Sequence, residues 1–447
     1  MNIYIPPNIE EVIERLEQNG FEAYIVGGCV RDSILGIPPK DYDITTSASP
    51  EEIKRCFSGY NTIDTGIEHG TVTVVSGGEN VEVTTFRIDG EYSDHRHPER
   101  VQFSRKLSDD LSRRDFTMNA MAYNSKTGLI DLFGGQEDLF RRKLCCVGEP
   151  AVRFEEDALR IMRALRFASE LGVEIEEATA SAVMRMKHLL GEVSAERLSK
   201  ELVLLLTGRS PYKVLSEFSG VLAVIIPEIL PCIGFDQHSR FHAYDVWNHT
   251  AYAVEYSSPM PDVRLALLFH DIGKPRCFTM DDEGAGHFAG HEKISAEIAA
   301  EVLKRLKFPA NTIKRVEQLI KFHYVTPVDD YKVVRRLLSK VGEEDFFLLA
   351  EVMKGDNWAK RSFCFERVHT VDSMKKKAEE IIAENQCFKL SGLAVSGNDM
   401  LAIGLKGAEI GEALEFLLDA VISEKAENSR ESLMEYVKEK FPEKFLS

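Results

Sequence analysis

The first 140 residues alternate short apolar runs with polar turns, which is typical of a small α+β domain. Residues 9–19 carry apolar positions at helical spacing and precede Gly20, so they predict an amphipathic helix that ends there. FEAYIVGG and KDYDITTS predict short strands, and VRDSILG between them predicts a helix that ends at Gly36. TVTVVSGG and NVEVTTFR alternate apolar and polar positions around Gly77 and predict a hairpin.

The remaining pattern divides the chain into an α+β head and a helical body in several pieces. Residues 88–110 are polar, rich in charge and contain Pro98, which predicts a mobile loop. Short strands and a second glycine pair end the head near Gln136, so a mixed sheet is expected there. From about Leu144 onward helical periodicity dominates. The pattern breaks near Gly208, at Pro227 to Gly234, at Met280 to Gly290 and near Asn385.

Length and composition agree with a multidomain protein. The chain has 447 residues, more than one hydrophobic core usually organises, with 44% hydrophobic and 28% charged residues. Apolar runs stay well short of the roughly 18 residues that span a bilayer, and no secretory signal opens the chain, so no membrane partner is expected. Eight cysteines without CxxC spacing predict a reduced, cytoplasmic protein.

The net charge of −17 argues against a surface coated with nucleic acid, although screening allows a local basic groove. Basic clusters suited to such a groove are Arg113–Arg114, Arg141–Lys143 and the triplet Arg160, Arg163 and Arg166.

Two aspartates and a glycine turn supply the first candidate chemistry. Asp41 and Asp43 lie at i and i+2 on a predicted strand, which would put both carboxylates on one face as a Mg²⁺ site. Gly27-Gly28 upstream lets backbone N–H groups approach a phosphate, and Arg31 can add a bidentate phosphate contact. Glu82 is either a third carboxylate beside the aspartates or an edge residue that faces solvent.

These motifs carry a resemblance to a known family. GGCVRDSILGIPPKDYDITT, RRDFTMNAMAYN from Arg113, DLFGGQEDL from Asp131 and EEDALRIMRALRFA from Glu155 resemble the class II tRNA nucleotidyltransferases, the CCA-adding enzymes of bacterial and eukaryotic type. The resemblance implies a head with a polymerase-β-like mixed sheet, followed by an all-α neck, body and tail. It also implies Asp41 and Asp43 as catalytic Mg²⁺ ligands. The expected boundaries are 1–140 for the head, 141–207 for the neck, 208–375 for the body and 376–447 for a tRNA-binding tail.

The resemblance implies that Asp157 and Arg160 select the incoming base. Both are predicted to lie on one helix, at i and i+3, and so to share a face. A carboxylate accepts and a guanidinium donates, which matches the exocyclic amine and bare ring nitrogen of cytosine and adenine. Uracil and guanine present the reverse pattern. Without the head motifs, the two residues would instead be read as an exposed ion pair. Glu156 and Arg163 are expected to brace this helix.

Further roles also rest on the resemblance. Arg113 and Arg114 are expected to bind the triphosphate and Asp115 the ribose hydroxyls. Asn119 and Arg163 complete the nucleotide-binding set with Gly28 and Arg31. The segment 84–103 resembles the flexible loop that family members need to switch from C to A.

A second constellation lies in the helical body. His249, the pair His270-Asp271 and Asp356 follow the order of the HD phosphohydrolase superfamily, which they resemble. Imidazoles and carboxylates around one ion suit Mn²⁺, Ni²⁺, Fe²⁺ or Mg²⁺. His291 and His323 are candidate ligands of a second metal, and Lys274 is a candidate phosphate contact.

The leading interpretation is template-independent addition of CCA to the tRNA 3′ end from CTP and ATP, with release of pyrophosphate and a possible additional HD phosphohydrolase activity. Three alternatives stay open: an enzyme that adds only A, a bacterial poly(A) polymerase, and an HD-type metal phosphodiesterase or phosphatase whose head only binds RNA. The expected macromolecular partner is the acceptor end of tRNA. Its path is expected to follow the basic neck.

Overall fold

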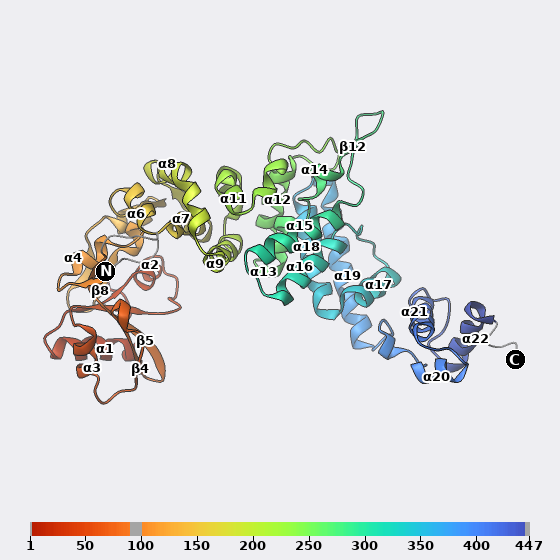
Figure 1. Ribbon diagram of the computed structural model, residues 1–447, viewed down its shortest axis with the longest axis horizontal. Helices are drawn as coiled ribbons and strands as arrows, with labels where there is room; N and C mark the ends of the chain where they lie inside the picture. Colours follow the sequence, from red (N-terminus) through yellow and green to blue (C-terminus); the bar gives the residue numbers. More distant parts are fainter. Residues whose placement is uncertain (1, 90–100, 443–447) are drawn as a thin grey trace. The chain divides into compact units, whose positions relative to one another are not determined.

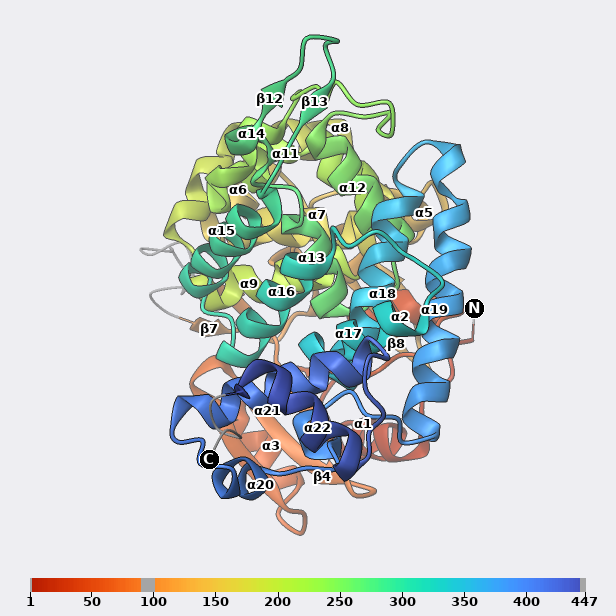
Figure 2. The same cartoon turned by 90° about the vertical axis from the view of Figure 1, so that its right-hand side faces the viewer.

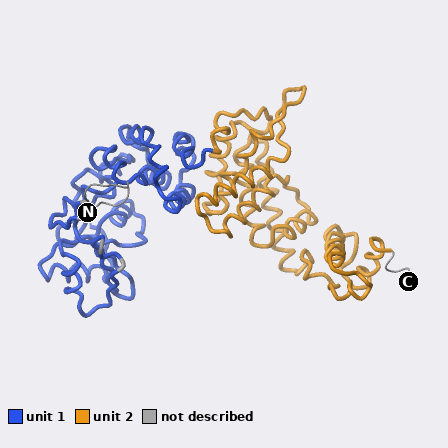
Figure 3. The backbone as a smooth tube through the Cα atoms, in the orientation of Figure 1, with its two compact units in different colours: residues 1–227 blue, residues 228–447 orange. Residues whose placement is uncertain are grey.

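The computed structural model describes residues 2–89 and 101–442. The chain forms two compact units, residues 1–227 and residues 228–447 (Figure 3). The first unit holds the sheet and the first helical layers, and the second is helical apart from one short hairpin. Each unit has its own apolar core, so each is described by itself.

A seven-stranded sheet in the order β3-β4-β5-β2-β1-β8-β9 forms the centre of the head. Its strands are β1 (Ala23–Val26), β2 (Asp43–Thr46), β3 (Thr62–Gly66), β4 (Thr71–Ser76), β5 (Glu79–Thr85), β8 (Met121–Asn124) and β9 (Gly128–Asp131). Strands β2 and β5 are parallel and the other neighbours are antiparallel, which confirms the predicted mixed sheet. The predicted hairpin around Gly77 is β4–β5.

Helices cover both faces of this sheet. Helix α1 (Pro7–Gln18) contacts β1 and β4, and α3 (Pro50–Cys56), which begins with a Ser49–Glu52 capping box, contacts β4 and β5 (Figure 1). Alternate residues of a strand face opposite ways, so Tyr24 and Val26 of β1 point to the other face. There they join the cluster of Leu107 and Leu111 from α4 (Leu107–Ser112).

The prediction of a mobile loop at residues 88–110 is wrong in part. Residues 107–112 form α4, and a two-stranded ribbon of β6 (Arg87–Asp89) and β7 (Val101–Phe103) precedes it. Two apolar residues in a six-residue helix give no visible periodicity, although both are buried against the sheet. Residues 90–100 lie outside the described residues.

The rest of the first unit is helical and packs on the long helix α7 (Leu159–Leu171). Helix α9 (Ala195–Leu206) runs against α7, with Leu165 and Leu202 fully buried between layers. The other helices are α5 (Gly135–Phe140), α6 (Pro150–Glu156), α8 (Glu177–Met186), α10 (Pro211–Glu217) and α11 (Ser219–Ile225). A short parallel pair, β10 (Lys143–Leu144) and β11 (Glu174–Ile175), interrupts them.

The centre of the second unit is a group of helices that pack against one another. These are α12 (Val246–Tyr256), α13 (Pro261–Phe269), α15 (His291–Arg305), α16 (Ala310–Phe322) and α18 (Glu343–Trp358). The hairpin of β12 (Thr279–Met280) and β13 (Gly286–His287) projects from them (Figure 2). A separate apolar cluster at the C-terminal end joins α20 (Gly397–Ala402), α21 (Ala408–Ile422) and α22 (Arg430–Lys440). Among the described residues, no helix has the length and apolar character needed to cross a membrane.

Candidate active sites

Three carboxylates lie close together at β2 and β5, two interior strands of the head sheet. Asp43 is the first residue of β2, and Asp41 lies two residues earlier, before the strand begins rather than on it as predicted. The parallel register pairs Ile44 with Val83, which places Glu82 of β5 beside Asp43. Glu82 is exposed, but it lies on an interior strand and its charge acts on Asp43, so it is a carboxylate neighbour of Asp43 that also faces solvent.

The electrostatics around these three carboxylates fit a divalent cation. Loss of hydration and the negative charges of Asp41 and Glu82 raise the pKa of Asp43 to about 6, against the opposing charge of Arg114. Repulsion among neighbouring carboxylates is relieved when a cation binds between them, and oxygen ligands suit Mg²⁺. The donor set is therefore one that Mg²⁺ fits.

The glycine turn and the RRD motif converge beside these carboxylates. Gly27 adopts φ +81 and precedes α2 (Gly28–Ile34). A Cβ on Gly27 would lie 3.1 Å from Nη1 of Arg114, so a side chain there would crowd this guanidinium. Arg31 is buried, and its Nη1 donates a 2.8 Å hydrogen bond to Oδ1 of Asn119.

Both arginines of the RRD motif are held by one buried aspartate. Asp110 is fully buried on α4 and accepts from Nη2 of Arg113 at 2.6 Å and from Nη2 of Arg114 at 3.1 Å. Although burial opposes its charge, Arg114 and Arg113 lower the pKa of Asp110. Sequence reasoning missed Asp110, since the pairing at i+3 and i+4 becomes visible only once residues 107–112 are recognised as a helix.

Asp115 connects the head to the neck helix. Its Oδ2 accepts from Nε of Arg163 at 2.8 Å, and its Oδ1 accepts from Nδ2 of Asn119 at 3.1 Å. Despite burial, Arg163 and Asn119 lower the pKa of Asp115 to about 2. The ring of Phe167 lies beneath the guanidiniums of Arg163, at 5.3 Å, and Arg31, at 5.1 Å. These predicted nucleotide-binding residues therefore form one connected group.

The predicted continuous helix through Asp157 and Arg160 is wrong. Helix α6 ends at Glu156, Asp157 has extended backbone angles, and α7 begins at Leu159. The carboxylate of Asp157 binds Arg197 at 2.7 Å, while Arg160 binds Glu156 at 2.6 Å. The expected brace by Glu156 is thus present, but the two template residues are each tied to another partner. No glycine or proline marks this break in the sequence.

The four HD residues of the second unit come together in a buried cluster. His249 lies on α12, His270 and Asp271 follow α13, and Asp356 lies on α18. Nε2 of His249 lies 3.1 Å from Oδ1 of Asp356, 3.4 Å from Oδ2 of Asp271 and 3.2 Å from Nε2 of His270. Four potential ligand atoms thus converge from two helices and the turn after α13, and this donor set suits a transition-metal ion.

The two candidate second-metal ligands adjoin the same aspartate. Nε2 of His291 lies 3.4 Å from Oδ1 of Asp271 and 3.4 Å from Nε2 of His323. Asp271 therefore faces His249 and His270 with one oxygen and His291 and His323 with the other. This arrangement fits two ions that share Asp271.

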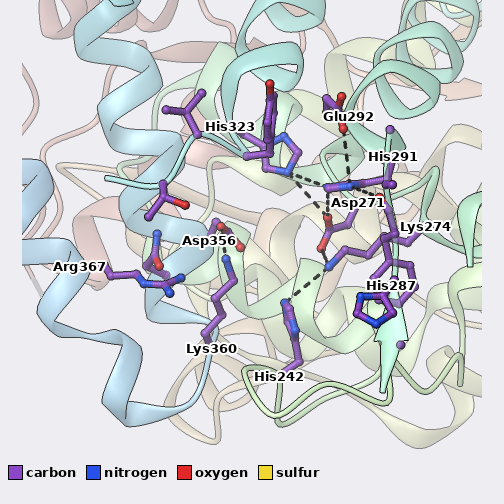
Figure 4. Close-up of a pocket in the computed structure, with 18 of the residues that line it drawn as sticks. His242, Asp271, Lys274, His287, His291, Glu292, His323, Asp356, Lys360 and Arg367 are labelled. Atoms are coloured by element: carbon purple, nitrogen blue, oxygen red, sulfur yellow. Dashed lines mark hydrogen bonds and ion pairs between the residues drawn. The ribbon is translucent and has the colours of Figure 1, made fainter. Parts of the chain in front are cut away.

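Two lysines neutralise the aspartates and line a cavity of about 550 Å³ (Figure 4). Nζ of Lys274 lies 2.6 Å from Oδ2 of Asp271, and Nζ of Lys360 lies 2.5 Å from Oδ2 of Asp356. Despite burial, the neighbouring cations hold the pKa of both aspartates well below its usual range. Although burial opposes its charge, Asp271 and Asp356 raise the pKa of His270 to about 9.

Sequence reasoning missed His242 in this cavity. Its Nε2 lies 3.5 Å from Nζ of Lys274, and its ring meets that of His249 edge-on at 4.9 Å. His242, His249 and Asp271 form a further set of atoms close enough to hold an ion. His242 precedes α12 on an irregular segment, where no periodicity could assign it an orientation.

Family models match three stretches of the chain. Residues 23–145 match the poly A polymerase head domain, and residues 172–233 match the probable RNA and SrmB-binding site of polymerase A. Residues 287–437 match the putative tRNA nucleotidyltransferase domain 2.

Relatives extend the match to the whole chain. The CCA-adding enzyme of Bacillus cytotoxicus is 34% identical over 433 residues, which cover 96% of this chain and 97% of that enzyme. The CCA-adding enzyme of Ligilactobacillus salivarius is 49% identical over 207 residues, so the match spans about half of that enzyme (51%) and 46% of this chain.

Solved structures show the same fold. The Bacillus stearothermophilus CCA-adding enzyme in complex with CTP superposes with a TM-score of 0.75 at 29% identity and 98% coverage of both chains. The Thermotoga maritima CCA-adding enzyme complexed with tRNA shares the fold with a TM-score of 0.57 at 19% identity, covering 99% of this chain and 100% of that one.

Proposed function

Because the chain belongs to the CCA-adding enzymes, a family of tRNA nucleotidyltransferases, we propose that it adds C, C and A to the 3′ end of tRNA from CTP and ATP. This proposal rests on one observation: the glycine turn, the carboxylates and the RRD motif come together at Arg114. This residue lies beside the glycine turn, and its charge acts on Asp43, so turn, carboxylates and RRD motif form one site.

In this reaction the tRNA 3′-hydroxyl attacks the α-phosphorus and pyrophosphate leaves. Asp41 and Asp43 would hold Mg²⁺, with Glu82 beside them. Bound Mg²⁺ would supply positive charge for the triphosphate and favour ionisation of the attacking hydroxyl. Arg113 and Arg114, oriented by Asp110, neutralise the triphosphate. Asn119 would contact the phosphates and Asp115 the ribose hydroxyls, and Gly28 would leave room for a phosphate at the turn.

Base selection falls to Asp157 and Arg160. The carboxylate accepts from the exocyclic amine of cytosine or adenine, and the guanidinium donates to the bare ring nitrogen. Uracil or guanine would leave buried polar groups unpaired, at about 1–3 kcal/mol each. The segment 84–103 is proposed to adjust the site between C and A. The head, neck, body and tail, with the boundaries given above, are proposed as the functional parts of the enzyme. We propose that the enzyme is cytoplasmic and recognises tRNA by its shape and its backbone.

The test offers Mg²⁺ and tRNAs that end before CCA, after C and after CC, with CTP, ATP or both. Product lengths on a sequencing gel are the readout. We expect every substrate to be completed to CCA, after which growth stops. Extension of only the CC-ended tRNA, by one A, would identify an enzyme that adds only A. Long A-tails would identify a poly(A) polymerase.

We further propose a metal-dependent phosphohydrolase activity in the second unit. The observation that favours it is the convergence of His249, His270, Asp271 and Asp356, of which Asp271 and Asp356 line a cavity together with Lys274. Bound Mn²⁺, Ni²⁺, Fe²⁺ or Mg²⁺ would activate a water and polarise a phosphate ester. Lys274 would contact the phosphate. We expect purified protein with each metal in turn to hydrolyse a chromogenic phosphate ester, and Asp271→Ala to abolish both hydrolysis and metal binding by calorimetry.

A further inference from the structure

The carboxylate of Asp157 is fixed by two hydrogen bonds before any base arrives. Its Oδ1 accepts from the backbone N–H of Leu159 at 3.1 Å, and its Oδ2 accepts from Nη2 of Arg197 at 2.7 Å. A carboxylate offers about four lone-pair positions, so each oxygen keeps one for a further donor. Asp157 can therefore hold Arg197 and still accept from an exocyclic amine.

Arg197 belongs to α9, which contacts the α6–α7 region through two side chains of opposite charge. Arg197 and Glu201 lie at i and i+4 on one face of α9. Arg197 binds Asp157, while Glu201 contacts Arg166 at 3.2 Å and Arg163 at 3.9 Å. The side chains of Arg197 and Asp157 are 24% and 19% exposed, so solvent screens their contact only in part. The packing of α9 against the α6–α7 region therefore holds the guanidinium of Arg197 at the carboxylate of Asp157.

We propose that Arg197 is a positioning residue that sets base selectivity by fixing the carboxylate of Asp157. This inference rests on the proposed addition of C and A. Asp157 lies outside the helices, three residues before Arg160, so only its bonded partners fix its direction. Without Arg197, the carboxylate could turn towards Arg160, and the acceptor and donor meant for the base would satisfy each other.

The expected effect is on choice among nucleotides rather than on addition in general. In Arg197→Ala, we expect kcat/KM for CTP and ATP to fall about tenfold or more, because one charge-assisted hydrogen bond is lost. The preference for CTP over UTP should fall by a similar factor. Arg197→Lys should restore part of the preference, since it keeps the charge but loses the planar fork. A merely structural role would lower kcat for all four nucleotides alike and leave the preference unchanged.

Steady-state kinetics on a CC-ended and a C-ended tRNA, with each of the four triphosphates alone, test this inference. Lys200→Ala is the matched control, since it removes an equal charge from the exposed side of α9. In an Asp157→Ala background, Arg197→Ala should have little further effect, because both changes remove one interaction. Multiplying effects in the double variant, or an unchanged CTP-to-UTP preference in Arg197→Ala, would overturn the inference.

Thermal unfolding of each variant separates selectivity from folding. If Arg197→Ala does not fold, Arg197→Gln carries the test, and an unchanged preference there overturns the inference. An unmutated protein that extends none of the tRNAs would overturn the proposed function and this inference with it. If the unmutated protein completes CCA but the Arg197 variant keeps its full preference for CTP over UTP, the inference is overturned and the proposed function stands.

Discussion

Among single residues, Asp43 links the chemistry most directly to pH. Its pKa of about 6 is raised, so the carboxylate becomes protonated as pH falls through that value and loses its affinity for a cation. At limiting Mg²⁺ we expect nucleotide addition to fall below about pH 6, and saturating Mg²⁺ should move this limb to lower pH. Glu82→Gln removes one charge that raises the pKa and should also move the limb down.

The measurement is kcat/KM for CTP between pH 5 and pH 8, at low and high Mg²⁺. Glu79→Gln on the same strand is the control and should leave the profile in place. An acid limb that ignores both Mg²⁺ and the Glu82 change would show that Asp43 does not govern it.

Asp115 makes a second pH prediction, for stability. Its pKa is lowered from 3.8 to about 2, so its contribution is complete above about pH 4 and is lost as pH falls through about 2. The shift corresponds to about 2 kcal/mol. We therefore expect Asp115→Asn to lower the free energy of unfolding by about that amount at pH 7 and by almost nothing near pH 2. Urea unfolding at several pH values measures this, with the exposed change Glu137→Gln as control. A difference independent of pH contradicts the prediction.

At the scale of elements, the close approach of α5 to the RRD segment leaves less room for a side chain than at any other glycine of the head that the structure describes. A Cβ on Gly135 would lie 2.2 Å from the carbonyl oxygen of Thr117, in the turn Thr117–Asn119. Gly135→Ala must therefore displace this turn and with it Asn119. We expect a loss of about 1–3 kcal/mol in stability and a clear fall in nucleotide addition.

Gly134→Ala is the matched control for this change. Gly134 has φ +77 but open space around its Cβ position, so alanine there costs only local strain of about 1 kcal/mol. Equal activity of the two variants would show that the approach of α5 does not position Asn119.

The elements also show which features of the fold and the site the sequence alone could predict. Strands β1, β2, β4 and β5 and helix α1 were predictable because their apolar periodicity reports burial on one face, whereas β3 was not predicted. The break at Asp157 was not predictable, because its carboxylate accepts from the backbone N–H of Leu159 and binds Arg197, forty residues away, without a local signal. His242 was missed for a similar reason: its position depends on packing beside His249 rather than on spacing. Candidate residues could thus be identified from motifs, whereas their partners required the fold.

For the whole molecule, two compact units with separate cores predict two separable activities. Asp41→Ala should abolish nucleotide addition by more than about a hundredfold, because it removes a metal ligand, and should leave ester hydrolysis unchanged. Asp271→Ala should do the reverse. Both activities are measured on each purified variant, with circular dichroism as the check on folding. Loss of both activities in one folded variant would contradict this division.

The anchoring of Asp157 by Arg197 has a consequence for heredity. An ordinary template is a nucleic acid, which can be replaced or corrected base by base. On the proposed base selection by Asp157 and Arg160, the three-letter CCA sequence would instead be specified by the fold of a few neck helices. A single substitution at their contact would then lower the accuracy of the 3′ end of every tRNA that the protein extends.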